Sequence, residues 1–143
     1  MISGLDDVVV AETKVSDVDG QAGRLVIRGR SLDDLVRDST YEDVLALLWE
    51  GFFEPAPPAA DLAKRLAAAR QTVFGHLQSI DTTLLKNPLF DVVRVLIARV
   101  VDGDDLDNAL LLVAAPAVFT PGIIRMRQGL EPIPPDEIGR AHV

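Results

Sequence analysis

The chain has 143 residues, no cysteine and a formal net charge of -8 at pH 7, and 48% of its residues are hydrophobic. A chain of this length and apolar content can bury a core, which excludes a disordered polar polypeptide. The acidic surface repels phosphate backbones and anionic lipid, and the lack of cysteine excludes disulfides, thiolate zinc sites and a cysteine nucleophile. We therefore expect a cytoplasmic protein that binds neither nucleic acid nor a membrane.

Two further features of the sequence support that expectation. The first ten residues lack the basic start and long apolar run of a signal peptide. The longest apolar run, residues 109–119, contains Pro116 and is shorter than the roughly 20 residues that span a bilayer.

Residues 8–30 favour extended structure. Three β-branched residues, 8–10, predict a first strand, and the sequence DVDG at 17–20 has the composition of a turn. Residues 23–29 form a second short run that is bounded by glycines. Together they predict a small antiparallel β ribbon.

The periodicity changes to that of helices from Ser31 onward. Ser31 and Thr40 each precede acidic residues, which is the pattern of a helix N-cap followed by a negative first turn. After Thr40, apolar residues recur at helical spacing, and Gly51 is placed to end that helix. These apolar residues are Tyr41, Val44, Leu45 and Leu48.

Three more helices are predicted after a proline-rich loop at 55–58. The first begins at Ala59 or Asp61 and carries an apolar stripe, and the second has Asn87 as its cap and Pro88 at its first position. The third runs over 106–127, interrupted or kinked at Pro116 and Pro121. Prolines at 132, 134 and 135 exclude regular structure beyond it. The stripes consist of Leu62, Leu66, Ala69, Val73 and Leu77 in the first helix, and Leu89, Val93, Leu96 and Val100 in the second. The prediction is a mainly α fold, with the ribbon over 8–30 and helices over 31–128.

Candidate chemical groups are few. The two histidines are His76, on a predicted helix where packing or a solvated position is the simpler interpretation, and His142, near the end of the chain. An acidic turn holds Asp102, Asp104, Asp105 and Asp107. It lacks the glycine and glutamate positions of a calcium loop, so we interpret it as a solvated turn that caps the next helix. No metal site and no Ser/His/Asp arrangement follows from these residues.

Three arginines leave an alternative open. Arg24, Arg28 and Arg30 alternate along the second strand and could meet an anion on one face. The simpler alternative is that they pair with the nearby acids Asp33, Asp34 and Asp38. Trp49 is expected to lie in a core or a partner interface.

Several motifs in register resemble the citrate synthase family, which includes 2-methylcitrate synthase. They are GLDDVVVAET at 4–13, SDVDG at 16–20, GRL at 23–25, RG at 28–29, STYEDV at 39–44, LLWEG at 47–51 and GLEPI at 129–133. The resemblance covers residues 4–136 and implies a helical fold with a small ribbon at its start. It places the chain in the N-terminal portion of such an enzyme.

The family resemblance implies an acyltransferase of the tricarboxylic acid cycle that condenses acetyl-CoA with oxaloacetate and water, giving citrate and CoA without a metal or other cofactor. Propionyl-CoA replaces acetyl-CoA in the 2-methylcitrate relatives. The catalytic Asp and His residues of the family have no counterpart in residues 1–136, so no catalytic or substrate-binding residue is assigned and the chain alone is expected to be inactive. Either it is a fragment of such an enzyme, or it is a non-catalytic interaction subunit that partners a separate catalytic chain. A free-standing helical binding module is the remaining option.

The resemblance also implies a homodimer, in which helices equivalent to 88–101 and 106–127 form the contact. Two departures from the family are visible: Asn87-Pro88-Leu89 replaces a usual His-Pro-Met, and Pro121-Gly122 interrupts a dimer helix and puts its normal packing in question. The last residues, 137–143, do not resemble the family and match the translation of a sequencing-library adapter. We expect them to be a non-native tail.

Overall fold

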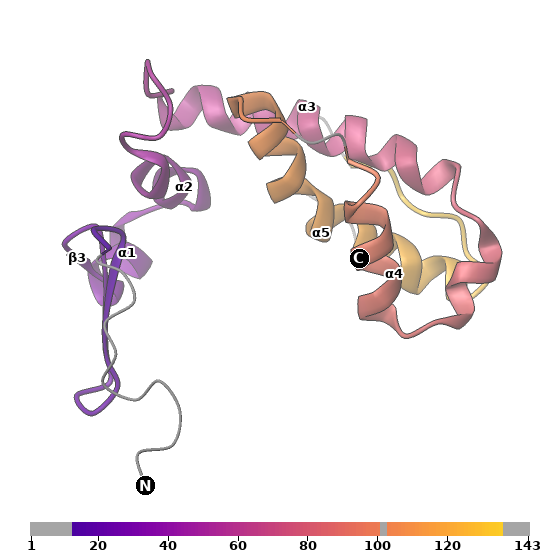
Figure 1. Ribbon diagram of the computed structural model, residues 1–143, viewed down its shortest axis with the longest axis horizontal. Helices are drawn as coiled ribbons and strands as arrows, with labels where there is room; N and C mark the ends of the chain where they lie inside the picture. The colour runs from indigo at the N-terminus through magenta and orange to yellow at the C-terminus, as the bar shows by residue number, and fades with distance from the viewer. Residues whose placement is uncertain (1–12, 101–102, 136–143) are drawn as a thin grey trace, which may run out of the picture. The chain divides into compact units, whose positions relative to one another are not determined.

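The computed structural model describes residues 13–100 and 103–135, and these residues divide after Glu50 into two units (Figure 1). The first unit holds a small sheet and two short helices, and the second is helical throughout. The prediction of a mainly helical fold with a small antiparallel sheet is confirmed. The strand expected at residues 8–10 and the tail expected at 137–143 lie outside the described residues.

The sheet has three antiparallel strands in the order β1-β2-β3, of which β1 (Ser16–Asp19) and β2 (Arg24–Ile27) form the predicted ribbon. The Asp19 carboxylate accepts hydrogen bonds from the backbone N–H groups of Gln21 and Ala22, which holds the connecting turn. The third strand, β3 (Arg30–Ser31), was not predicted. The predicted second strand was too long, because Arg28 and Gly29 have φ angles of 47° and 79° and form the turn into β3.

Side-chain caps fix both helices of the first unit. In α1 (Leu32–Asp38), the Ser31 hydroxyl accepts from the backbone N–H of Asp34, as predicted. In α2 (Tyr41–Trp49), Thr40 and Asp43 form a reciprocal capping box. Gly51 follows α2 with a φ of 79°, which confirms its predicted role as the end of the helix. The apolar stripe of α2 is only partly buried, since Leu45 is covered whereas Tyr41 is 57% exposed.

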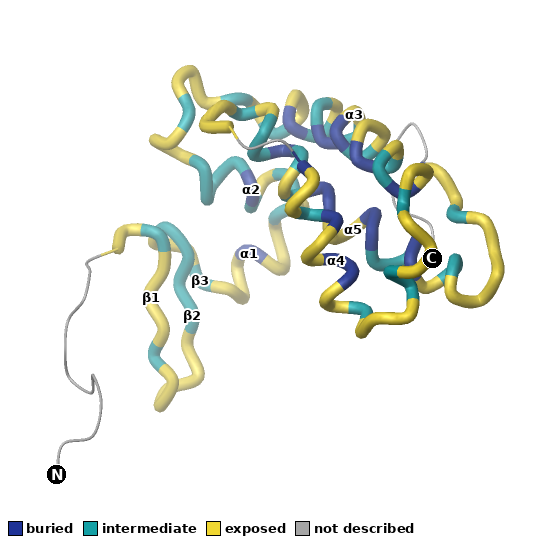
Figure 2. Tube along the Cα trace, turned by 45° about the vertical axis from the view of Figure 1, so that its right-hand side comes forward, coloured by how far each residue is buried: buried dark blue, intermediate teal, exposed yellow. Residues whose placement is uncertain are grey.

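The core of the second unit is formed by three helices, in which α3 (Ala59–Gln78) and α4 (Leu89–Ile97) both contact α5 (Leu106–Arg127). Figure 2 shows the buried residues of α3 gathered along one side of that helix. The five residues predicted as its stripe are all buried. In α4 the buried set differs from the predicted stripe at two positions. Val92, which was not predicted, is fully buried, whereas Leu89 is only half-buried. These apolar stripes provide the hydrophobic contact that holds the unit together.

A short 3₁₀ helix, η1 (Thr82–Lys86), precedes α4 and was not predicted. The Asp81 carboxylate caps η1 by accepting from the backbone N–H of Thr83. The start of α4 was predicted one residue too early: Pro88 is its N-cap, and Asn87 instead ends η1. A proline fixes φ without a side-chain acceptor, so α4 begins without a side-chain cap bond.

Helix α5 continues through both of its prolines, so of the two predicted outcomes the interruption is wrong, and the kink stays a prediction. A proline removes the hydrogen bond to the carbonyl four residues earlier, which here belongs to Leu112 for Pro116 and to Ala117 for Pro121. Leu112 and Ala117 are exposed, so water can reach that side of the helix and satisfy the carbonyls. The buried residues of α5 are Leu110, Ala114, Ala115, Val118, Phe119, Gly122 and Ile123.

The length and composition of α5 also fit a membrane-spanning helix. It has 22 residues, and its most apolar window has a mean hydropathy of 1.8. The sequence run of 109–119 had suggested a segment too short for a bilayer. Because α5 carries the core residues that face α3 and α4, packing within the unit accounts for its apolar composition.

Helices α5 and α3 approach each other closely at Gly122. A Cβ at this position would lie 2.4 Å from Cδ1 of Leu77, a residue that is only 1% exposed. Glycine therefore allows the two helices to approach here. Within the Pro121-Gly122 departure noted in the sequence, Gly122 thus makes room for Leu77 of the same chain.

Candidate functional site

His76, the one described histidine, lies half-buried on α3 and packs its ring edge-on against Phe119 of α5. The ring centroids are 6.5 Å apart and the interplanar angle is 87°, a favourable aromatic arrangement. The packing interpretation of His76 therefore accounts for its position. His142 lies outside the described residues.

Asp105, in the acidic turn before α5, caps that helix as predicted, whereas Asp102 of the same turn lies outside the described residues. The Asp105 carboxylate accepts from the backbone N–H of Asn108 at 2.8 Å and from its side-chain amide at 2.9 Å. These hydrogen bonds lower the pKa of Asp105 below its ordinary value of 3.8. Asp107 pairs with Arg65 of α3, so it joins two helices. Among residues 13–100 and 103–135, no group of three or more His, Cys, Asp or Glu side chains is arranged to hold a metal ion.

The three arginines do not share a strand face. Arg24 and Arg30 belong to β2 and β3, but Arg28 lies in the turn between those strands. Its Nη2 donates to the backbone carbonyls of Leu48 at 3.2 Å and Glu50 at 2.8 Å. These carbonyls end α2, where the helix dipole favours a positive charge.

The alternative was that these arginines pair with the nearby acids Asp33, Asp34 and Asp38. Asp34 pairs instead with Arg37, one turn along α1. The sequence could not predict this contact between the Arg28 guanidinium and the end of α2, because it joins residues about 20 positions apart and follows no local pattern. Trp49, the last residue of α2, is half-buried in the same unit.

The carboxyl groups with lowered pKa values serve as helix caps. The Thr40 hydroxyl and backbone N–H donate to Asp43, and Arg30 adds a smaller favourable charge, so the pKa of Asp43 falls below 3.8. The backbone N–H and then the side chain of Thr83 lower the pKa of Asp81 in the same way. A general base needs a pKa near the working pH, so these groups are poorly suited to proton transfer at neutral pH.

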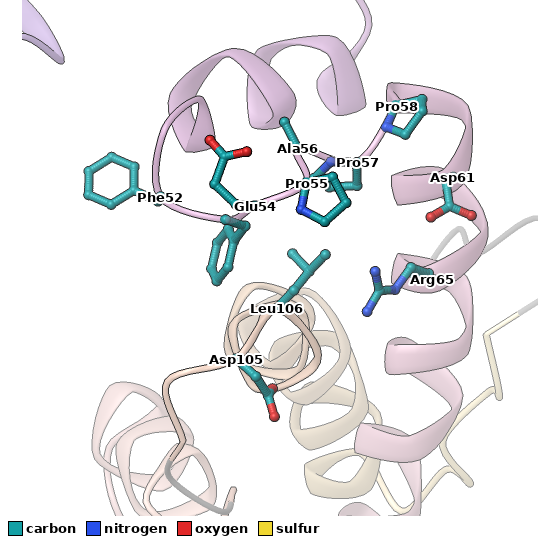
Figure 3. Close-up of a pocket in the computed structure, with 11 residues that line it drawn as sticks. Phe52, Glu54, Pro55, Ala56, Pro57, Pro58, Asp61, Arg65, Asp105 and Leu106 are labelled. Carbon is teal, nitrogen blue, oxygen red and sulfur yellow. The ribbon is translucent and has the colours of Figure 1, made fainter.

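A cleft of about 630 Å³ lies between loop 52–58 and the first turns of α3 and α5 (Figure 3). Figure 3 shows the Leu106 side chain pointing toward Pro55. The charged residues that line the cleft are Glu54, Asp61, Asp105 and Arg65. Arg65 is already paired with Asp107, so the excess negative charge disfavours an anionic ligand in this cleft.

The polar groups described here thus stabilise helices and loops, and the fold itself is the feature that points to a family. Residues 4–142 match the sequence model of the family described as "Citrate synthase, C-terminal domain". The chain belongs to the citrate synthase family. The match includes residues 137–142, and the description names a C-terminal domain, whereas the sequence motifs had placed the chain in the N-terminal portion. That placement stays a prediction.

Individual citrate synthases support the assignment. The chain is 46% identical over 74 residues to the citrate synthase of Haloferax volcanii, an alignment that covers 52% of this chain and 20% of that protein. It is 34% identical over 144 residues to the citrate synthase of Mycolicibacterium smegmatis, covering 92% and 38% of the two chains. The 2-methylcitrate synthase 2 of Corynebacterium glutamicum is 28% identical over 144 residues, covering 93% and 37%.

A solved structure gives the same result. The citrate synthase of Thermotoga maritima superposes with a TM-score of 0.72 at 25% identity, over 96% of this chain and 38% of that chain. The chain therefore spans well under half the length of the citrate synthases that it matches.

Proposed function

We propose that this chain is a structural portion of a citrate synthase that condenses acetyl-CoA with oxaloacetate and water, and that the catalytic groups lie outside it. The observation that carries the proposal is the use of its polar side chains. His76 packs against Phe119, and the carboxylates with lowered pKa values cap helices. Because these polar groups are used for packing and helix capping, we infer that the chain has a structural role and that other residues transfer the proton.

The proposal also covers the acyl-CoA substrate, the cellular location and the cofactor requirement. Relatives include both citrate synthases and a 2-methylcitrate synthase, so propionyl-CoA in place of acetyl-CoA is the alternative. We propose a cytoplasmic enzyme that needs no metal or other cofactor and binds neither nucleic acid nor a membrane. The charge of -8 supports the exclusion of nucleic acid.

The activity test is release of CoA thiol from acetyl-CoA and oxaloacetate, with propionyl-CoA in a parallel series. We expect the purified 143-residue chain to release no CoA above the uncatalysed rate. The full-length citrate synthase of Mycolicibacterium smegmatis, assayed beside it, should be active. Release that rises in proportion to the concentration of the purified chain would overturn the proposal.

The alternative of an interaction subunit makes the same prediction for the isolated chain, so a second measurement separates the two. Resequencing the locus from genomic DNA determines whether the reading frame continues. A continuing frame that encodes the rest of the enzyme supports the fragment. A stop codon at the same place in clean reads supports a separately encoded subunit.

We further propose that the outward face of α4 takes part in a homodimer of the complete enzyme. Phe90 and Val95 are 73% and 43% exposed. Asp91 and Arg94, which lie between these two residues in the sequence, form an ion pair with each other. The exposed residues 90, 91, 94, 95 and 98 lie at helical spacing and therefore share one face. Exposed apolar side chains such as Phe90 and Val95 on one helix face are typical of a surface that another polypeptide covers.

The association of the chain tests this surface. Phe90→Glu replaces a large exposed apolar side chain of this face with a charge, so light scattering after gel filtration should show less self-association than for the unmodified chain. The matched control is Val36→Glu on α1, because Val36 is 77% exposed and lies outside the proposed surface. Equal effects of the two substitutions, or none from Phe90→Glu, would argue against the α4 surface.

A further inference from the structure

We draw no further inference here: the strongest candidate, the cleft between loop 52–58 and the first turns of α3 and α5 (Figure 3), carries nothing because Arg65, its one basic lining residue, is already paired with Asp107 and nothing in the structure shows what would fill it.

Discussion

Replacing Gly122 with alanine should destabilise the helical unit, whereas the same replacement at Gly75 should stabilise it. Both glycines lie inside helices, Gly75 in α3 and Gly122 in α5. A Cβ at Gly75 would meet nothing within 4 Å, while a Cβ at Gly122 would lie 2.4 Å from Cδ1 of Leu77. The two substitutions thus share one backbone effect and differ in their packing.

The magnitude follows from separating these two effects. Alanine is about 1 kcal/mol more favourable than glycine in a helix interior, and this gain applies to both sites. Forcing a methyl group into a filled core costs about 1–3 kcal/mol, and this cost applies to Gly122 alone. Gly75→Ala should therefore gain about 1 kcal/mol. Gly122→Ala should lose between about 0 and 2 kcal/mol, which leaves a gap of about 1–3 kcal/mol between the variants.

Urea unfolding followed by circular dichroism at 222 nm measures the gap directly. With a denaturant slope of about 2 kcal/mol per molar, a difference of about 2 kcal/mol separates the two midpoints by about 1 M. A second test combines Gly122→Ala with Leu77→Ala, because Leu77→Ala removes the methyl group with which the new Cβ would clash. In that background Gly122→Ala should no longer destabilise the unit.

Two results would refute the reasoning. If Gly122→Ala and Gly75→Ala raise the midpoint by the same amount, then α3 and α5 do not meet closely at Gly122. If the loss caused by Gly122→Ala persists beside Leu77→Ala, then the strain arises at some other contact.

Two further predictions concern the first unit. Arg28→Met removes the donor to the carbonyls of Leu48 and Glu50, so the free energy of unfolding should fall by about 1–3 kcal/mol, measured by urea unfolding. Thr40→Ala removes a capping hydroxyl and should cost about 1 kcal/mol at neutral pH. It should also raise the pKa of Asp43 toward 3.8, which a carboxyl NMR titration measures. Because the folded-state pKa of Asp43 is depressed, its contribution to stability is fully present above the unfolded value and is lost as the pH falls through the folded value. The difference between the unmodified chain and Thr40→Ala should therefore shrink below about pH 3.8.

Matched controls make these two predictions specific. Arg24→Met removes an exposed arginine from β2 and should change stability by less than about 0.5 kcal/mol. An equal loss from Arg24→Met and Arg28→Met would show that general charge, not the end of α2, is responsible. Thr40→Ser keeps the hydroxyl and should keep the depressed pKa of Asp43. A pKa that is unchanged in Thr40→Ala would contradict the assignment of the hydroxyl as its main cause.

Local sequence predicted those features that depend on neighbouring residues. Ser31 and Thr40 cap their helices as expected, since a cap needs only a side-chain oxygen and an N–H three residues later. The apolar stripe of α3 was also predicted in full, because a spacing of three and four residues places side chains on one face wherever that face is buried. The family resemblance, which rests on short ordered motifs, is confirmed by the match over 4–142.

Tertiary structure decided what distant residues do to one another. The role of Arg28 depends on carbonyls that the fold brings to the turn after β2, and the sequence placed Arg28 on a strand instead. The effect of Gly122 on packing depends on Leu77, which lies 45 positions earlier in the chain. From the sequence, Pro121-Gly122 was interpreted only as a pair that disrupts the helix. α5 remains continuous through Pro116 and Pro121 because its buried residues pack against α3 and α4, while the carbonyls that the prolines leave unbonded belong to the exposed residues Leu112 and Ala117. The chain's sequence thus predicted its five α-helices, the caps of α1, α2 and α5, and its family. Packing alone determined which polar and small residues hold those helices together, since long-range contacts have no local periodicity.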